Sequence, residues 1–132
     1  MAFSVLIVDD NRLFLEAARA LLEREGLRVV GVAATSAEAL QRAEELRPQV
    51  VLVDIMLGGE SGFDLARRLA GPSGDGGPVV ILISTHAEAE FADLVAESPA
   101  AVFVSKQELS AGEIRRIVDG WAPGGPPGVR AR

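Results

Sequence analysis

Short apolar runs alternate with amphipathic stretches along the chain. The runs are rich in β-branched residues, as buried strands usually are. They occupy residues 3–8, 27–32, 50–54, 78–83 and 101–104. Between the runs, apolar residues recur every three or four positions, which predicts amphipathic helices. In the stretch 11–25 this spacing is shown by Phe14, Ala17, Ala18, Leu21 and Leu22. The pattern predicts five strand–helix units in succession.

Residues that commonly begin and end helices mark the predicted boundaries. Thr35 to Glu38 and Ser110 to Glu113 have the spacing of a capping box, so helices are expected to begin there. Ser61 is placed to cap the third helix. Gly26 and Pro48 are expected to end the first two helices. A further helix over 87–97 has only a short apolar stripe, and residues 71–77 form a loop by composition.

Each later helix should bury its own apolar stripe. The second helix is expected to bury Ala39, Leu40, Ala43 and Leu46. The third should bury Phe63, Ala66 and Leu69. The face of the last helix is expected to consist of Ile114, Ile117, Val118 and Trp121. Residues 123–128 are rich in Pro and Gly, so we divide the chain into one domain over 1–121 and a tail or linker over 122–132.

Repeated strand–helix alternation predicts an α/β fold with a parallel sheet covered by helices on both faces. Right-handed crossovers make consecutive strands run the same way, so their carboxyl ends share one edge. Ligands of such open sheets bind at that edge. The run 50–54 is a continuous apolar segment that ends in Asp54, as expected for a strand buried on both faces.

Polar side chains follow four of the five predicted strands. These residues are Asp9, Asp10, Asp54, Ser84, Thr85 and Lys106. Carboxylates packed together repel one another, which raises at least one pKa unless a cation intervenes. Carboxylate oxygens are ligands for a hard divalent cation, so Mg²⁺ is favoured over zinc. We therefore expect a magnesium site at this edge.

Such a site is suited to phosphoryl transfer, in which a protein mainly positions groups and neutralises charge. Asp54 would attack phosphorus and form an acyl phosphate. Mg²⁺ would be held by Asp10 and Asp54, and by Asp9 through water. Lys106 and Ser84 would each contact a phosphoryl oxygen.

Each residue alone also has an ordinary interpretation. Asp9 and Asp10 could cap the first helix, and Asp54 could be a turn carboxylate before two glycines. Ser84 could bond its own backbone, and a loop lysine such as Lys106 is usually just solvated. Their joint occurrence at one sheet edge favours the functional interpretation.

Composition narrows the possible functions. The chain has 132 residues, 48% of them hydrophobic, which suits one domain with a single core. It has no cysteine and one histidine, which excludes thiolate and His-rich metal sites. A formal net charge of −6 argues against a nucleic-acid surface. No apolar run is long enough to span a membrane and no signal peptide is evident, so we expect a cytoplasmic protein.

The ordered set of motifs resembles the response-regulator receiver domains of two-component signalling, over about residues 3–121. The motifs that carry the resemblance are Val8-Asp9-Asp10, Val53-Asp54, Gly62, Ile83-Ser84-Thr85 and Val104-Ser105-Lys106. It implies a flavodoxin-like (βα)5 fold with strand order 2-1-3-4-5. It also implies that Asp54 is the phosphoacceptor for a histidine kinase or a small phosphodonor. The domain would then control an output domain or partner protein, without being an enzyme acting on external substrates.

The resemblance also implies a role for each site residue. The backbone carbonyl of Met56 would join Asp9, Asp10 and Asp54 as Mg²⁺ ligands. Ser84, Thr85 and Lys106 would bind the phosphoryl group. Ser84 and Phe103 would form a switch that reshapes the face made by the fourth helix, fifth strand and fifth helix, through which a homodimer is also possible. Gln107 and Gly58 depart from the family, which often has proline at both places.

Two other functions fit the same fold. One is a protein-interaction module that does not depend on phosphorylation, whose complexes would be unchanged by Asp54→Asn. The other is a phosphohydrolase with an aspartate nucleophile, which the short connections disfavour because they provide no lid over a substrate. The output is open: the chain is either a stand-alone receiver or part of a longer regulator, which could be a DNA-binding one.

Overall fold

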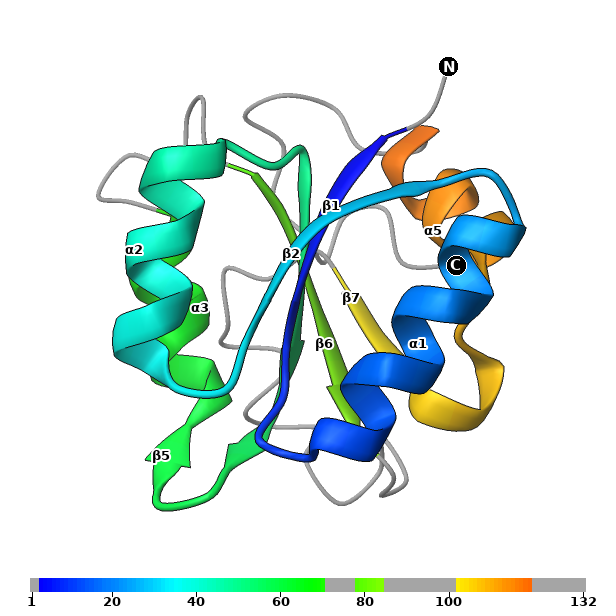
Figure 1. Cartoon of the computed structure of the whole chain (residues 1–132). Helices are drawn as coiled ribbons and strands as arrows, with labels where there is room; N and C mark the ends of the chain where they lie inside the picture. Colours follow the sequence, from blue (N-terminus) through cyan, green and yellow to red (C-terminus); the bar gives the residue numbers. More distant parts are fainter. Residues whose placement is uncertain (1–2, 71–77, 85–101, 120–132) are drawn as a thin grey trace.

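A five-stranded parallel sheet forms the centre of the molecule in the computed structural model, which describes residues 3–70, 78–84 and 102–119 (Figure 1). The strands are β1 (Ser4–Val8), β2 (Arg28–Ala33), β3 (Val50–Asp54), β6 (Val79–Ser84) and β7 (Val102–Ser105). Their order is β2-β1-β3-β6-β7, and every neighbouring pair is parallel. This is the predicted 2-1-3-4-5 order, so the predicted fold class is confirmed.

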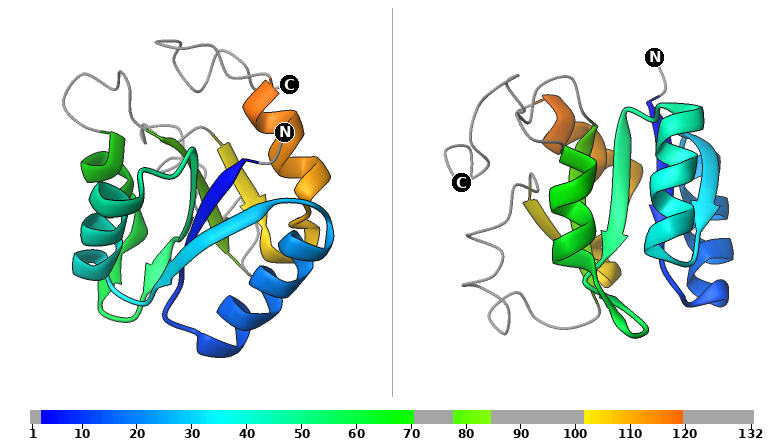
Figure 2. Two further views of the ribbon diagram at one scale, coloured as in Figure 1. Left: turned by 45° about the horizontal axis from the view of Figure 1, so that its top comes forward. Right: turned by 90° about the vertical axis from the view of Figure 1, so that its left-hand side faces the viewer.

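Helices cover both faces of this sheet (Figures 1 and 2). On one side lie α1 (Arg12–Arg24) and α5 (Ala111–Asp119), and on the other lie α2 (Ser36–Leu46) and α3 (Gly62–Ala70). Each layer encloses its own cluster of buried apolar side chains. The molecule therefore has two cores separated by the sheet. No helix in the described ranges has the length and apolarity needed to cross a membrane.

The central strand β3 serves both cores. All five of its residues are buried. Val50 and Leu52 belong to the cluster under α1 and α5, while Val51 and Val53 belong to the cluster under α2 and α3. The alternation follows from the two-residue period of a strand. It explains why the sequence of β3 is apolar at every position before Asp54, the last residue of the strand.

The predicted helix boundaries are close to the observed ones. Thr35 caps α2 by accepting the N–H of Glu38 at 3.1 Å, and Ser110 caps α5 by accepting that of Glu113 at 3.0 Å. Ser61 accepts the N–H of Asp64 at 3.4 Å at the start of α3. After α1, Gly26 takes a φ of +99°, a conformation that favours glycine.

Two helix faces differ from the prediction. Leu46, expected to be buried, is 40% exposed, because it is the last residue of α2 and lies beside Gly31 of the edge strand β2. Ala17 is exposed, and Leu15 is buried in its place. Ala17 lies outside the stripe of α1 that faces the sheet, whose centre is Leu15, Ala18 and Leu22.

Several expectations fall on residues outside the described ranges. These are the loop over 71–77, the helix over 87–97, Thr85, Trp121 and the tail 122–132. Conversely, two short elements were not expected. A small hairpin, β4 (Met56–Leu57) and β5 (Glu60–Ser61), follows Asp54, and a 3₁₀ turn, η2 (Lys106–Glu108), follows β7.

Two hydrogen bonds join the end of α1 to α5 near its start. The Ala111 N–H of α5 donates to Glu25 Oε1 at 2.7 Å. In return, the Arg115 guanidinium donates to the backbone carbonyl of Glu25 at 3.0 Å. One backbone donor at a helix start and one carbonyl at a helix end, which the helices themselves leave unpaired, are thereby satisfied. This pair of contacts is called the α1–α5 clasp below.

Candidate functional site

Three carboxylates meet at the carboxyl edge of the sheet. Asp9 and Asp10 follow β1, and Asp54 is the last residue of the adjacent strand β3. One oxygen from each of the three lies within 4.8 Å of the others. Asp9 and Asp54 are buried, while Asp10 is exposed. Residues 45 positions apart in sequence thus meet because their strands are parallel neighbours.

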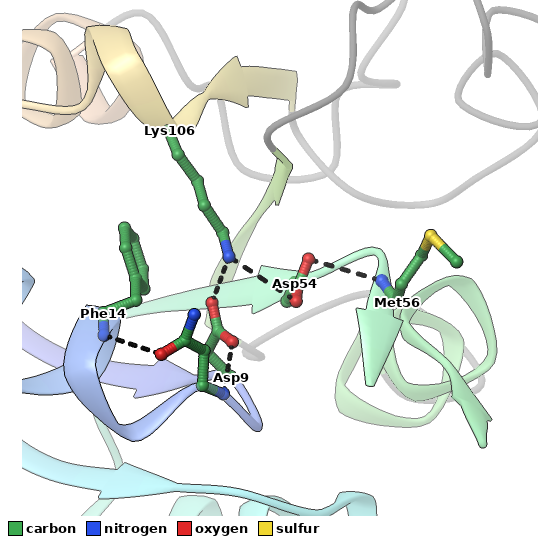
Figure 3. A network of polar contacts seen from close by, with 6 residues as sticks. Asp9, Phe14, Asp54, Met56 and Lys106 are labelled. Carbon is green, nitrogen blue, oxygen red and sulfur yellow. Dashed lines mark hydrogen bonds and ion pairs between the residues drawn. The ribbon is translucent and has the colours of Figure 1, made fainter. Parts of the chain in front are cut away.

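Lys106, which directly follows the edge strand β7, extends toward the same carboxylates (Figure 3). Its Nζ lies 2.5 Å from Asp9 Oδ2 and 3.6 Å from Asp54 Oδ2. The side chains are only 11% exposed for Lys106, 0% for Asp9 and 10% for Asp54. Ion pairs shielded from water in this way are screened little by salt. Lys106 therefore neutralises part of the negative charge of the cluster.

Asp9 is fixed by two contacts of different kinds. Its Oδ1 accepts the backbone N–H of Asn11 at 2.8 Å. Its Oδ2 is buried and has no directed hydrogen-bond partner in the described ranges, so its contact is the ion pair with Lys106. A buried carboxylate oxygen of this kind has room in its coordination for a further positive partner.

The fold disfavours the charge on Asp54. Burial, and then the nearby charge of Asp9, raise the pKa of Asp54 from its ordinary value of 3.8 to about 6. Lys106 and the Met56 N–H, which donates to Asp54 Oδ1 at 3.3 Å, act in the opposite direction. A divalent cation bound among the three carboxylates would remove this repulsion. The donor set therefore fits Mg²⁺, which prefers carboxylate oxygens.

The β4–β5 hairpin is packed tightly on the backbone of Asp54. Gly62 donates its N–H to the Ile55 carbonyl at 2.8 Å. A Cβ at Gly62 would lie 2.1 Å from the Asp54 carbonyl oxygen, so no larger residue fits without moving backbone. At the other end, Glu60 Oε1 accepts the Ser36 N–H at the start of α2 at 2.8 Å. The hairpin that carries Met56 is thus held at both sides, although the Met56 side chain is 53% exposed.

Gly58 forms the turn of this hairpin with a φ of +59°, a left-handed conformation that favours glycine. A Cβ at this position would lie 3.3 Å from Asp10 Oδ2. The turn therefore passes close to the acidic cluster, and the glycine found where the family often has proline suits this conformation.

The predicted switch residues lie on the two strands beyond β3. Ser84 is the buried last residue of β6, whose Ile83 pairs with Asp54 in the sheet. Phe103 lies in β7, is partly buried and packs against the cluster under α2 and α3. Both positions are compatible with the predicted roles, which remain predictions.

Sequence reasoning missed the environment of Lys106. Phe14 was recognised only as part of the core face of α1, yet its ring centroid lies 4.3 Å from Lys106 Nζ. Asn11 was expected near the start of α1, and it caps the helix by accepting the Phe14 N–H at 3.2 Å. Periodicity places a residue on a helix face, but it gives no signal for which side chain from another strand will lie against it.

Curated proteins similar to this chain include response regulators and a methylesterase. Response regulator GacA of Pseudomonas viridiflava is 34% identical over 103 residues, covering 77% of this chain and 47% of GacA. Protein-glutamate methylesterase/protein-glutamine glutaminase 5 of Myxococcus xanthus (strain DK1622) is 36% identical over 110 residues, covering 83% of this chain and 31% of that protein. The chain thus spans about half or less of the length of these relatives.

The fold and family comparisons agree with these relatives. The signal receiver domain of a modulated diguanylate cyclase from Desulfovibrio desulfuricans G20 superposes with a TM-score of 0.74 at 31% identity, covering 90% of this chain and 92% of that one. Residues 5–119 match the response regulator receiver domain family. This match includes every strand and helix that frames the acidic cluster except the first residue of β1. The chain therefore belongs to the response regulator receiver domain family.

Proposed function

We propose that this chain is a phosphorylation-controlled switch in which Asp54 is the phosphoacceptor. The observation that carries the proposal is the meeting of the Asp9, Asp10 and Asp54 carboxylates with the Lys106 ammonium at the carboxyl edge of the sheet. The phosphoryl group would come from the phosphohistidine of a sensor histidine kinase or from a small phosphodonor.

The reaction follows from the chemistry of these groups. A carboxylate oxygen of ionised Asp54 attacks phosphorus, the bond from phosphorus to the leaving group breaks, and an acyl phosphate forms on Asp54. Lys106 stabilises the charge on the phosphoryl oxygens, and buried Ser84 is placed to donate a hydrogen bond to one of them. Thr85 is proposed as a further phosphate contact.

Asp9, Asp10, Asp54 and the Met56 carbonyl would hold Mg²⁺. When bound, Mg²⁺ supplies positive charge that neutralises the carboxylates and the transferring group. The raised pKa of Asp54 supports this assignment, because the buried carboxylate and its neighbour Asp9 repel each other and a cation between them would relieve the repulsion.

Phosphorylation would change the shape of one face of the molecule. Ser84 would turn toward the phosphoryl group, and the partly buried Phe103 would move into the space that opens. The face that includes β7 and α5 would then be recognised by an output domain, a partner protein or a second copy of this chain. The relatives include a DNA-binding transcriptional activator and a protein-glutamate methylesterase, so they offer more than one class of output for such a switch.

The proposal is tested with acetyl phosphate and Mg²⁺ by intact-protein mass spectrometry. We expect a gain of one phosphoryl group, which Asp54→Asn and chelation of Mg²⁺ both abolish. Asp64→Asn is the matched control, because Asp64 is an exposed carboxylate on α3 paired with Arg67, and it should leave labelling unchanged. Labelling that persists in Asp54→Asn would show that another residue is the acceptor.

The partner arm of the experiment separates the proposal from a phosphorylation-independent module. Two assays in a cytoplasmic extract of the source organism compare the phosphorylated protein with the unphosphorylated protein. One measures binding to the cognate sensor kinase, and the other measures dimerisation. Binding that is the same with and without Mg²⁺ and unchanged by Asp54→Asn would favour that alternative.

A further inference from the structure

Four residues at the acidic site form a closed circuit of contacts (Figure 3). Asp9 accepts the N–H of Asn11, and Asn11 accepts the N–H of Phe14 as the cap of α1. The ring of Phe14 lies under the ammonium of Lys106, which returns to Asp9 through the 2.5 Å ion pair. The start of α1 is therefore fixed relative to the acidic cluster, and with it the aromatic ring that faces Lys106.

The Phe14 ring lies against the Lys106 ammonium together with the carboxylates of Asp9 and Asp54. A centroid distance of 4.3 Å is within the range of a cation–π interaction. Because the Lys106 side chain is 11% exposed, this attraction acts with little competition from water. The long, flexible lysine side chain would otherwise have many rotamers available.

We propose that Phe14 is a positioning residue for Lys106, holding the ammonium over Asp9 and Asp54. The inference rests on the proposed function, because it concerns the same phosphoryl-transfer site. A ring face attracts a cation without a single preferred direction, unlike a hydrogen-bond acceptor. The ammonium can therefore turn from Asp9 toward a phosphoryl oxygen on Asp54 while its contact with the ring is kept.

Lys106 is the only lysine in the chain, which makes a direct test possible. Labelling with ¹³C-lysine gives NMR signals from this single side chain. Protons above the face of an aromatic ring are shielded, so the Lys106 ε-protons should resonate upfield of free lysine. Phe14→Leu should remove the upfield shift, and Phe14→Tyr, which keeps the ring, should retain it. Unshifted ε-protons in the unsubstituted protein would overturn the inference.

The functional readout is the rate of labelling by acetyl phosphate at saturating Mg²⁺. Loss of a cation–π contact should slow labelling of Phe14→Leu by roughly 2- to 30-fold. Phe14→Tyr should restore most of the rate. Leu13→Ala is the matched control, because Leu13 neighbours Phe14 on α1 and is 78% exposed, so it should change neither readout. Thermal unfolding of each variant checks that the fold is intact.

The two readouts separate the two proposals. If the unsubstituted protein is not labelled, the proposed function fails, while the NMR comparison still decides whether Phe14 holds Lys106. If it is labelled and folded Phe14→Leu reacts at the same rate, or Phe14→Tyr is as slow as Phe14→Leu, the positioning role of the ring is refuted.

Discussion

Asp54 is ionised at neutral pH in a place that disfavours its charge. Its pKa of about 6 lies above the ordinary 3.8, first because of burial and then because of Asp9. A folded state that binds this proton more tightly than the unfolded chain loses stability as pH rises from about 4 to about 6. The residue that we propose as the phosphoacceptor therefore lowers the stability of the folded state once it is ionised.

This cost can be measured without Mg²⁺. Asp54→Asn should raise the free energy of unfolding at pH 7 by up to about 3 kcal/mol, the value of a two-unit pKa difference. The difference should shrink as pH falls through 6 toward 4, where the protonated Asp54 is neutral like Asn. Urea unfolding at several pH values checks this. A stabilisation by Asp54→Asn that is constant from pH 4 to pH 7 would contradict the assigned cause.

At the scale of elements, the β4–β5 hairpin depends on the absence of a side chain at Gly62. A Cβ there would lie 2.1 Å from the Asp54 carbonyl oxygen and 2.8 Å from Ile55 Cα. Both contacts are with backbone, so a rotamer change cannot relieve them. The hairpin, and with it Met56, can lie against Asp54 only when residue 62 is glycine.

We predict that Gly62→Ala lowers the free energy of unfolding by roughly 2–4 kcal/mol. It should also weaken Mg²⁺ binding, because the hairpin carries the proposed Met56 ligand. Gly59→Ala is the control in the same hairpin, since a Cβ there meets no atom within 4 Å. Chemical denaturation and Mg²⁺ titration compare the two. Equal effects of both substitutions would show that the contact at Gly62 is not the cause.

The elements differ in how far their sequences predict them. The strands of the sheet were predicted to within a residue or two, because each is a run of β-branched residues long enough to show its pattern. The hairpin was not, since two-residue strands have no period, and Ile55-Met56-Leu57 looks like a continuation of β3. The η2 turn after β7 likewise has no repeating signal.

The acidic site, too, is predictable only as far as the pattern of strands and helices determines it. Strand direction predicts that Asp9, Asp10, Asp54 and Lys106 share an edge, because parallel strands bring their carboxyl ends together. The contact between Phe14 and Lys106 was not predictable in this way. It depends on the rotation of α1 over the sheet and on the path of η2, and the periodicity of apolar residues predicts neither of them.

At the scale of the whole molecule, the sheet divides the core in two. Ile114 of α5 is buried in one cluster and Val80 of β6 in the other. Buried side chains on opposite faces of the sheet share few neighbours. A substitution in one cluster should therefore change the packing of the other cluster only slightly. The two layers are expected to contribute to stability independently.

A double-mutant cycle tests this independence. Ile114→Val should cost about 1 kcal/mol and Val80→Ala about 2 kcal/mol, from lost apolar burial and the small cavities left. The double variant should cost their sum to within about 0.5 kcal/mol. Urea unfolding of the four proteins gives the result. A coupling energy above about 1 kcal/mol would mean that the sheet transmits packing changes between its faces.

The α1–α5 clasp has a consequence for the order in which the chain can fold. The Ala111 N–H and the Glu25 carboxylate that accepts it are 86 residues apart. Closing a flexible loop of that length costs about 4 kcal/mol in entropy beyond a constant contribution. On the ribosome, α1 must wait until nearly all of this domain has been synthesised before its end can be secured. Until then, α1, which carries Phe14 and is capped by Asn11, lacks these two contacts at its C-terminal end.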